Sequence, residues 1–72
     1  MNGAKLAQIR RAKGWTQQRL AVAAGVHVMT VSAAERDAQE PLLATVEAIA
    51  RALNISVADL LAEPEQTEAR AS

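Results

Sequence analysis

The 72-residue sequence has no cysteine, tyrosine or phenylalanine, and Trp15 is its only aromatic residue. Without cysteine the chain forms neither a disulfide bond nor a thiolate metal site. It has only three glycines and two prolines, and no apolar run as long as a membrane span or a signal-peptide core. Alternating apolar and polar residues, the pattern of a β-strand, are absent as well. These absences favour a small, all-helical protein of the cytoplasm.

The residues that catalysis or metal binding would need are also scarce. His27 is the only histidine, so a metal site has no second imidazole and no thiolate. Ser32 and His27 share no recognisable nucleophilic motif, and a chain this short leaves little room for a catalytic pocket. We therefore expect no enzymatic activity, no metal or other cofactor, no small-molecule ligand and no membrane partner.

The charges are balanced overall but unevenly distributed. Residues 1–36 contain six Lys and Arg against one Glu, whereas residues 37–72 contain two Arg against seven acids. A basic half of this kind suits a nucleic-acid partner. Chance segregation of solvated surface charges explains the same counts and stays open as an alternative.

Apolar residues at helical spacing predict five short helices. Leu20 and Ala21 share one face of the second helix, and Val46, Ile49 and Leu53 recur along the fourth. Leu42 is assigned to the same apolar face as Val46. The expected helices cover residues 3–13, 17–24, 28–36, about 42–53, and a last turn ending at 61. The sequence thus predicts an all-α, compact five-helix domain over 1–61, followed by a polar, acidic and disordered tail over 62–72.

Local signals mark the ends of these helices. Thr16 and His27 occupy N-cap positions, where a side chain accepts a free backbone N–H. Gly14 ends the first helix, and Asn54 suits the left-handed end of the fourth. Two further motifs support these limits, namely the capping box of Ser56 with Asp59 and the hydrophobic staples Trp15–Leu20 and Ile55–Leu60.

The sequence predicts that the second and third helices cross at a steep angle through a tight turn. Ala21 is small enough for close approach, Gly25 accepts a left-handed backbone, and Val31 fills the joint. From about residue 6 to residue 61 the sequence resembles the phage-repressor-like (XRE or Cro-type) helix-turn-helix family. The resemblance implies a DNA-binding transcriptional regulator, associated with the nucleoid, that places helix 28–36 in the major groove of double-stranded DNA.

The resemblance also implies which residues of helix 28–36 face the bases. Val28, Met29 and Ala33 occupy base-contacting positions, but none can form the paired hydrogen bonds by which Arg reads guanine or Gln reads adenine. We therefore expect weak direct readout, carried by the polar residues nearby. The base-facing candidates are His27, Val28, Met29, Thr30, Ser32 and Ala33.

Contacts to the DNA backbone are expected at the start of the second helix, whose free N–H groups and dipole favour an anion. Gln17 matches a phosphate-contacting position of the family and is the first choice there. For each basic candidate, a solvated surface charge is an equally good explanation. The backbone candidates are Thr16, Gln17, Gln18, Arg11, Lys13, Arg19 and Arg36. The loop residues Asp37, Gln39 and Glu40 replace the bases that relatives carry, which should weaken binding and its salt dependence.

Two structural roles follow from the resemblance. Arg10 and Glu35 match positions that form an ion pair between the first and third helices. A homodimer is implied as well, bound to a palindromic operator with half-sites about 34 Å apart. Its contact candidates are Ile55, Val57, Leu60 and Leu61, some of which must instead serve the core.

A protein-interaction module of the same fold, such as an antitoxin or anti-repressor, is the alternative to a DNA-binding regulator. The apolar tip formed by Val28 and Met29, the missing loop bases and the acidic second half favour it. The two hypotheses differ in their dependence on salt, since only DNA binding weakens steeply as salt rises.

Overall fold

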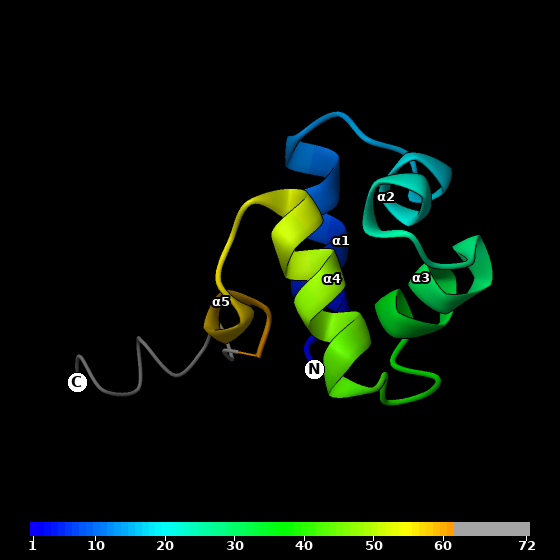
Figure 1. Cartoon of the computed structure of the whole chain (residues 1–72), viewed down its shortest axis with the longest axis vertical. Coiled ribbons are helices and arrows are strands. Elements are labelled where there is room, and N and C mark those ends of the chain that lie inside the picture. Colours follow the sequence, from blue (N-terminus) through cyan, green and yellow to red (C-terminus); the bar gives the residue numbers. More distant parts are fainter. Residues whose placement is uncertain (62–72) are drawn as a thin grey trace.

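The computed structural model describes residues 1–61, which contain five helices and no strand. This architecture confirms the predicted all-α, five-helix fold. The expected tail over 62–72 lies outside the described residues. In Figure 1, α1 and α4 lie against each other, with α2 and α3 on one side of them and α5 on the other. The helices are α1 (Gly3–Ala12), α2 (Gln17–Ala24), α3 (Val28–Glu35), α4 (Leu43–Leu53) and α5 (Val57–Leu61).

The second helix begins and ends where its local signals predict, and the first ends at Ala12, one residue before the expected end. The hydroxyl of Thr16 accepts the backbone N–H of Arg19 at 3.0 Å and caps α2, as expected. Asn2 caps α1 in the same way, its Oδ1 accepting the Lys5 N–H at 3.0 Å. Gly25 takes φ +73°, the left-handed conformation that closes α2. Nearest-neighbour chemistry is therefore enough to set these ends.

The later helices follow their signals with one exception. Ser56 and Asp59 form the predicted capping box, with reciprocal hydrogen bonds of 3.2 and 3.3 Å. Asn54 has φ +61° and ends α4 as expected. Leu42 was wrongly placed on the buried face of the fourth helix, because its side chain is 77% exposed. Its backbone is extended and α4 begins at Leu43, so Leu42 never enters the helical repeat.

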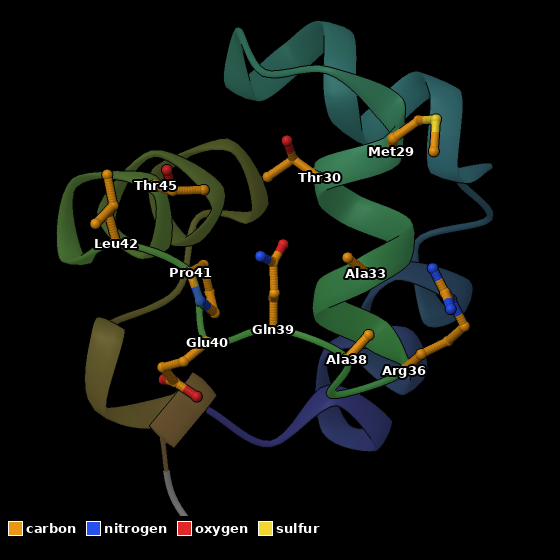
Figure 2. A pocket seen from close by; sticks show the side chains of 10 residues that line it. All are labelled: Met29, Thr30, Ala33, Arg36, Ala38, Gln39, Glu40, Pro41, Leu42 and Thr45. Carbon is orange, nitrogen blue, oxygen red and sulfur yellow. The ribbon is translucent and has the colours of Figure 1, made fainter.

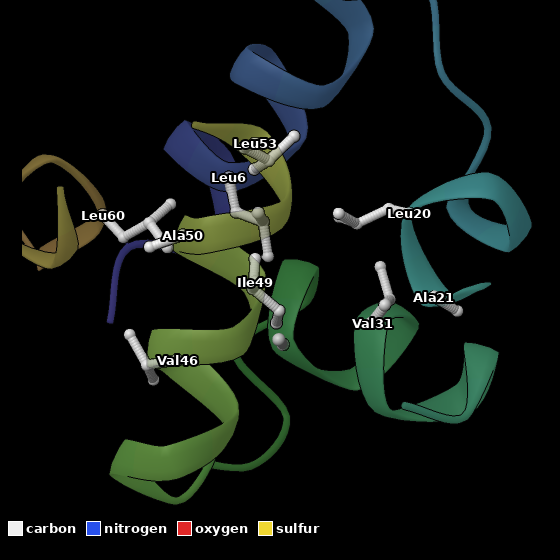
Figure 3. Packing of buried hydrophobic residues seen from close by; sticks show 10 residues of the cluster. Leu6, Leu20, Ala21, Val31, Val46, Ile49, Ala50, Leu53 and Leu60 are labelled. Carbon is white, nitrogen blue, oxygen red and sulfur yellow. The ribbon is translucent and has the colours of Figure 1, made fainter. Parts of the chain in front are cut away.

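The buried side chains come from all five helices. Figure 3 shows Leu20 and Val31 of the α2–α3 pair turned toward α1 and α4, and Leu60 of α5 beside Ala50. Two alanines, Ala21 of α2 and Ala34 of α3, are almost fully buried. Small side chains at these positions allow each helix to approach its neighbours closely. The core consists of Leu6, Leu20, Ala21, Val31, Ala34, Val46, Ile49, Ala50, Leu53 and Leu60.

Gly3 marks the closest approach of α1 to α3. A Cβ atom added there would lie 2.5 Å from the backbone oxygen of Glu35 and closer still to that of Ala34. The N–H of Gly3 also donates to Asp37 Oδ1 at 3.1 Å, just beyond the end of α3. The start of α1 is thus joined to the end of α3 by backbone contact. Within residues 1–61, every helix is too short or too polar to cross a bilayer.

We expect Gly3→Ala to destabilise the domain by about 2–3 kcal/mol, because the new methyl group overlaps backbone atoms that cannot rotate away. Gly14→Ala is the matched control. Gly14 has φ +75° with nothing within 4 Å of its Cβ position, so only backbone strain of roughly 1 kcal/mol applies there. Urea unfolding measures both. Equal losses, or a more stable Gly3→Ala variant, would contradict the close approach.

Candidate nucleic-acid interface

The corner between α2 and α3 turns one side of α3 inward and leaves the other side free. The turn is closed by the Val26 N–H, which donates to the Ala21 oxygen at 3.0 Å. His27 then starts α3, its Nδ1 accepting the Met29 N–H at 3.0 Å. Val31 and Ala34 are buried against the rest of the domain. The opposite face of α3 is therefore the one that a partner can reach.

The base-facing candidates occupy this outer face to different degrees. Met29 is 65% exposed, and His27 is exposed as well. Thr30, Ser32 and Ala33 are half-buried. Val28 is also half-buried and packs on the core, so it presents less surface than its place in the sequence indicates. The face carries two hydroxyl groups but no charge before Arg36, the residue that ends α3.

A groove of about 760 Å³ runs between α3 and the following segment, 38–45 (Figure 2). Met29, Thr30 and Ala33 form one wall, and Leu42 and Thr45 form the other. The sequence gives no direct sign of this groove, since its shape depends on how the loop folds back beside α3. The remaining lining residues are Arg36, Ala38, Gln39, Glu40 and Pro41.

The acidic loop is partly used inside the domain. Asp37 accepts the Gly3 N–H, and its own N–H donates to the Ala34 oxygen at 3.2 Å. It takes φ +54°, a left-handed conformation that turns the chain sharply after α3. The Ala38 N–H donates to the Ala33 oxygen at 3.0 Å. Asp37 therefore holds the loop against α1 and α3, a role that sequence reasoning missed.

The basic candidates Arg11, Lys13, Arg19 and Arg36 are all exposed. Two of them gather at the single aromatic ring. The Nζ of Lys13 lies 5.7 Å from the Trp15 ring centroid, and the guanidinium carbon of Arg19 lies 5.1 Å from it. Both distances are within reach of a cation–π attraction. Two positive charges therefore lie at Trp15, in the connection between α1 and α2.

The start of α2 differs from the expectation at Gln17. Its side-chain Nε2 donates to Glu35 Oε1 at 2.9 Å, so the amide group expected to face phosphate is hydrogen-bonded within the domain. Thr16 uses its hydroxyl as the helix cap, and Gln18 is exposed. Eighteen positions separate Gln17 from Glu35 in the sequence, and no local pattern signals their contact.

Arg10 and Glu35 are brought together across α1 and α3. Arg10 Nε lies 2.6 Å from Glu35 Oε2, and Nη2 lies 3.1 Å from Oε1. The third donor, Nη1, reaches the Trp15 backbone oxygen at 2.7 Å. Both side chains are nearly buried, 9% and 5% exposed. The guanidinium thus links α1 to the start of α2 and to α3.

The carboxyl group of Glu35 has a lower pKa than an isolated glutamate, so it loses its proton more readily. Burial by itself would raise the pKa of its carboxyl group. Hydrogen bonds from Arg10 and Gln17, with the positive charges of Arg10 and Arg11, outweigh that effect and lower the pKa. The carboxylate form is therefore the one that the surrounding residues stabilise.

The candidates for a dimer contact divide between surface and core. Leu60 is 0% exposed, so it serves the core, the alternative that the sequence leaves open for these four residues. Ile55 and Val57 are half-buried and pack on the core. Leu61 is 47% exposed and is the most accessible of the four.

Within the described residues, no three His, Cys, Asp or Glu side chains gather as metal ligands.

Comparison with known proteins gives consistent matches. The family model described as Helix-turn-helix (HTH_3) matches residues 6–60. The chain is 35% identical over 60 residues to the HTH-type transcriptional regulator SutR of Escherichia coli (strain K12), covering 83% of this chain and 34% of SutR. It thus spans about a third of the length of the curated relatives it matches.

Two solved structures are similar over most of the chain. The restriction-modification controller protein C.AhdI from Aeromonas hydrophila is 33% identical with a TM-score of 0.78, over 81% of this chain and 88% of that one. SinR, the master regulator for biofilm formation from Bacillus subtilis, solved in complex with DNA, is 35% identical with a TM-score of 0.81. That match covers 86% of this chain and 100% of the other.

We expect Glu35→Gln to cost roughly 3 kcal/mol at pH 7, because it leaves the buried Arg10 charge without its partner. The folded-state pKa of Glu35 lies below its unfolded value of about 4.3, so its contribution is complete above that pH. The contribution is lost as the pH falls through the folded-state pKa. The difference in unfolding free energy between wild type and variant should therefore shrink as the pH falls below the unfolded value.

Denaturant titrations from neutral to acidic pH make this measurement. Glu47→Gln is the matched control, because Glu47 is exposed on α4 and its replacement should change stability little at any pH. A difference for Glu35→Gln that stays constant across the range would show that the charged form is not what the site stabilises.

Proposed function

The chain belongs to the XRE-type helix-turn-helix family, and from that membership we propose that it is the DNA-binding domain of a transcriptional regulator. One observation carries the proposal: the α2–α3 corner buries Val31 and Ala34 and leaves the other face of α3 accessible. The same fold was solved in SinR in complex with DNA. On this proposal α3 enters the major groove and residues 1–61 are the folded unit.

Phosphate contacts fix the docking. Lys13 and Arg19 are the exposed cations at the Trp15 ring, and they lie beside the start of α2. The free N–H groups and the dipole of that helix end favour an anion. Arg36 lines the groove at the end of α3, and Arg11 adds to the same positive half. Because the side chain of Gln17 is held by Glu35, its backbone N–H is the group proposed to face phosphate.

A homodimer supplies the second half of the site. One domain of this size buries little surface on DNA, and pairing two copies raises affinity and demands a two-fold operator. The exposed side chain of Leu61 at α5, with the half-buried Ile55 and Val57, is the surface proposed for the contact. Half-sites about 34 Å apart, one helical turn of DNA, follow from that arrangement.

A protein-interaction role is the second candidate. Met29 and Leu42 line the two walls of the groove and are 65% and 77% exposed, and Leu43, next to Leu42 in the chain, is 63% exposed. Apolar surface of this kind is common at protein contacts. Salt separates the two functions, since an apolar contact does not release counterions.

We expect binding to duplex DNA to weaken steeply between about 50 and 200 mM salt. Arg36→Ala should lower affinity by a similar factor for every duplex and reduce the slope of log K against log salt by about 1. Arg51→Ala is the matched control, since Arg51 is also exposed near a helix end but lies on α4, in the acidic second half of the sequence. Fluorescence anisotropy of labelled duplexes measures both.

The wild-type titration decides between the two candidate functions. Binding that is absent at low ionic strength, or insensitive to salt, would favour the protein-interaction role. Equal effects of the Arg36 and Arg51 substitutions would show that only the total charge matters and that α3 has no defined place on DNA.

We expect Leu61→Glu to weaken self-association at least about 10-fold, because a two-fold contact counts the lost apolar burial twice. Val22→Glu places the same charge on an exposed apolar residue of α2, which lies on the other side of α1 and α4 from α5, and should leave association unchanged. Sedimentation equilibrium over a range of concentrations measures the effect. A monomeric wild type, or equal loss in both variants, would remove α5 as the dimer contact.

A further inference from the structure

Gln39 lies inside the groove beside α3. Its side chain extends from the loop into the space between Ala33 and the wall formed by Leu42 (Figure 2). It is an exposed residue, and none of the side-chain hydrogen bonds of residues 1–61 involves it. Its amide therefore keeps both donor and acceptor available to a partner in the groove.

The backbone beneath Gln39 is held in place. The two preceding residues are hydrogen-bonded to α3, through the Ala38 N–H to Ala33 and the Asp37 N–H to Ala34. Asp37 is tied in addition to the start of α1 through Gly3. The loop therefore carries Gln39 at a defined position relative to the outer face of α3, although the side chain itself stays exposed.

The neighbouring residues of α3 leave base recognition incomplete. Met29 and Ala33 offer no hydrogen-bond donor, and the hydroxyl of Thr30 pairs with several base edges without distinguishing them well. Ala33 is also small, which leaves open the space that Gln39 extends into. A larger side chain at that position would occupy the groove.

A glutamine amide has the pattern that α3 lacks. Its oxygen accepts from the adenine N6 amino group while its nitrogen donates to N7, a pair that no other base presents in the major groove. We propose that Gln39, a loop residue outside the helix-turn-helix, determines specificity by reading one adenine in each half-site. The inference rests on the proposed DNA-binding function.

The experiment selects duplexes from a random pool with the full 72-residue chain, then measures affinities for the selected sequence and for single-base changes. Wild type should prefer adenine at one half-site position by about 10-fold or more. Gln39→Ala should lose that preference while keeping its affinity for unrelated DNA. Gln39→Lys should move the preference toward guanine, which Lys reads.

Gln8→Ala is the control, because Gln8 is an exposed glutamine on α1 that does not line the groove. It should select the wild-type sequence. Unchanged selection by Gln39→Ala, or an equal loss of affinity for all duplexes, would overturn the inference, the second result indicating a phosphate contact. A wild type that shows no salt-sensitive DNA binding would overturn the proposed function itself.

Discussion

The carboxylate of Glu35 joins three helices, and the arrangement of the remaining structure depends on it. It stands on α3, accepts two hydrogen bonds from Arg10 of α1 and one from Gln17 of α2. Arg10 adds a bond to the Trp15 backbone at the start of α2. Within the described residues no buried side-chain nitrogen or oxygen is left without a partner, which is the condition for tolerating a charge pair in a core.

This polar link matters because the apolar core around it is small. Three of its ten members are alanines, and alanine contributes little burial per residue. Small side chains allow the helices to pack closely but constrain their angles weakly. The directional hydrogen bonds of Arg10 and Glu35 constrain how α1, α2 and α3 are oriented relative to one another. They therefore also constrain the orientation of the exposed face of α3.

Charged, apolar and polar side chains occupy different parts of the surface around α3. Positive charge gathers around Trp15 and at Arg36, while the exposed face of α3 is nearly neutral. From the sequence alone, the acidic loop 37–40 is interpreted only as lacking the basic residues that would contact phosphate. In the structure, its Asp37 joins the start of α1 to the end of α3. The loop also carries the unpaired amide of Gln39 into the groove. The accessible surface therefore combines a nearly neutral helix with a polar loop and a separate group of cations.

The sequence by itself determined the five helices and those ends that carry a local signal, because each such signal acts within four residues. Thr16, Gly25, Asn54 and the pair Ser56–Asp59 set their backbone conformations without help from distant chain. The fold followed, since helices of known faces and short connections pack in few ways.

Only the tertiary structure decided the contacts between side chains far apart in sequence. The bond from Gln17 to Glu35, the burial of Leu60 and the groove that Gln39 enters belong to this class. Leu42 shows the same limit, because one extended residue before α4 moves it from the expected core to the surface. The physical reason is that periodicity assigns a residue to a helix face, whereas its partner across the domain depends on how those faces meet.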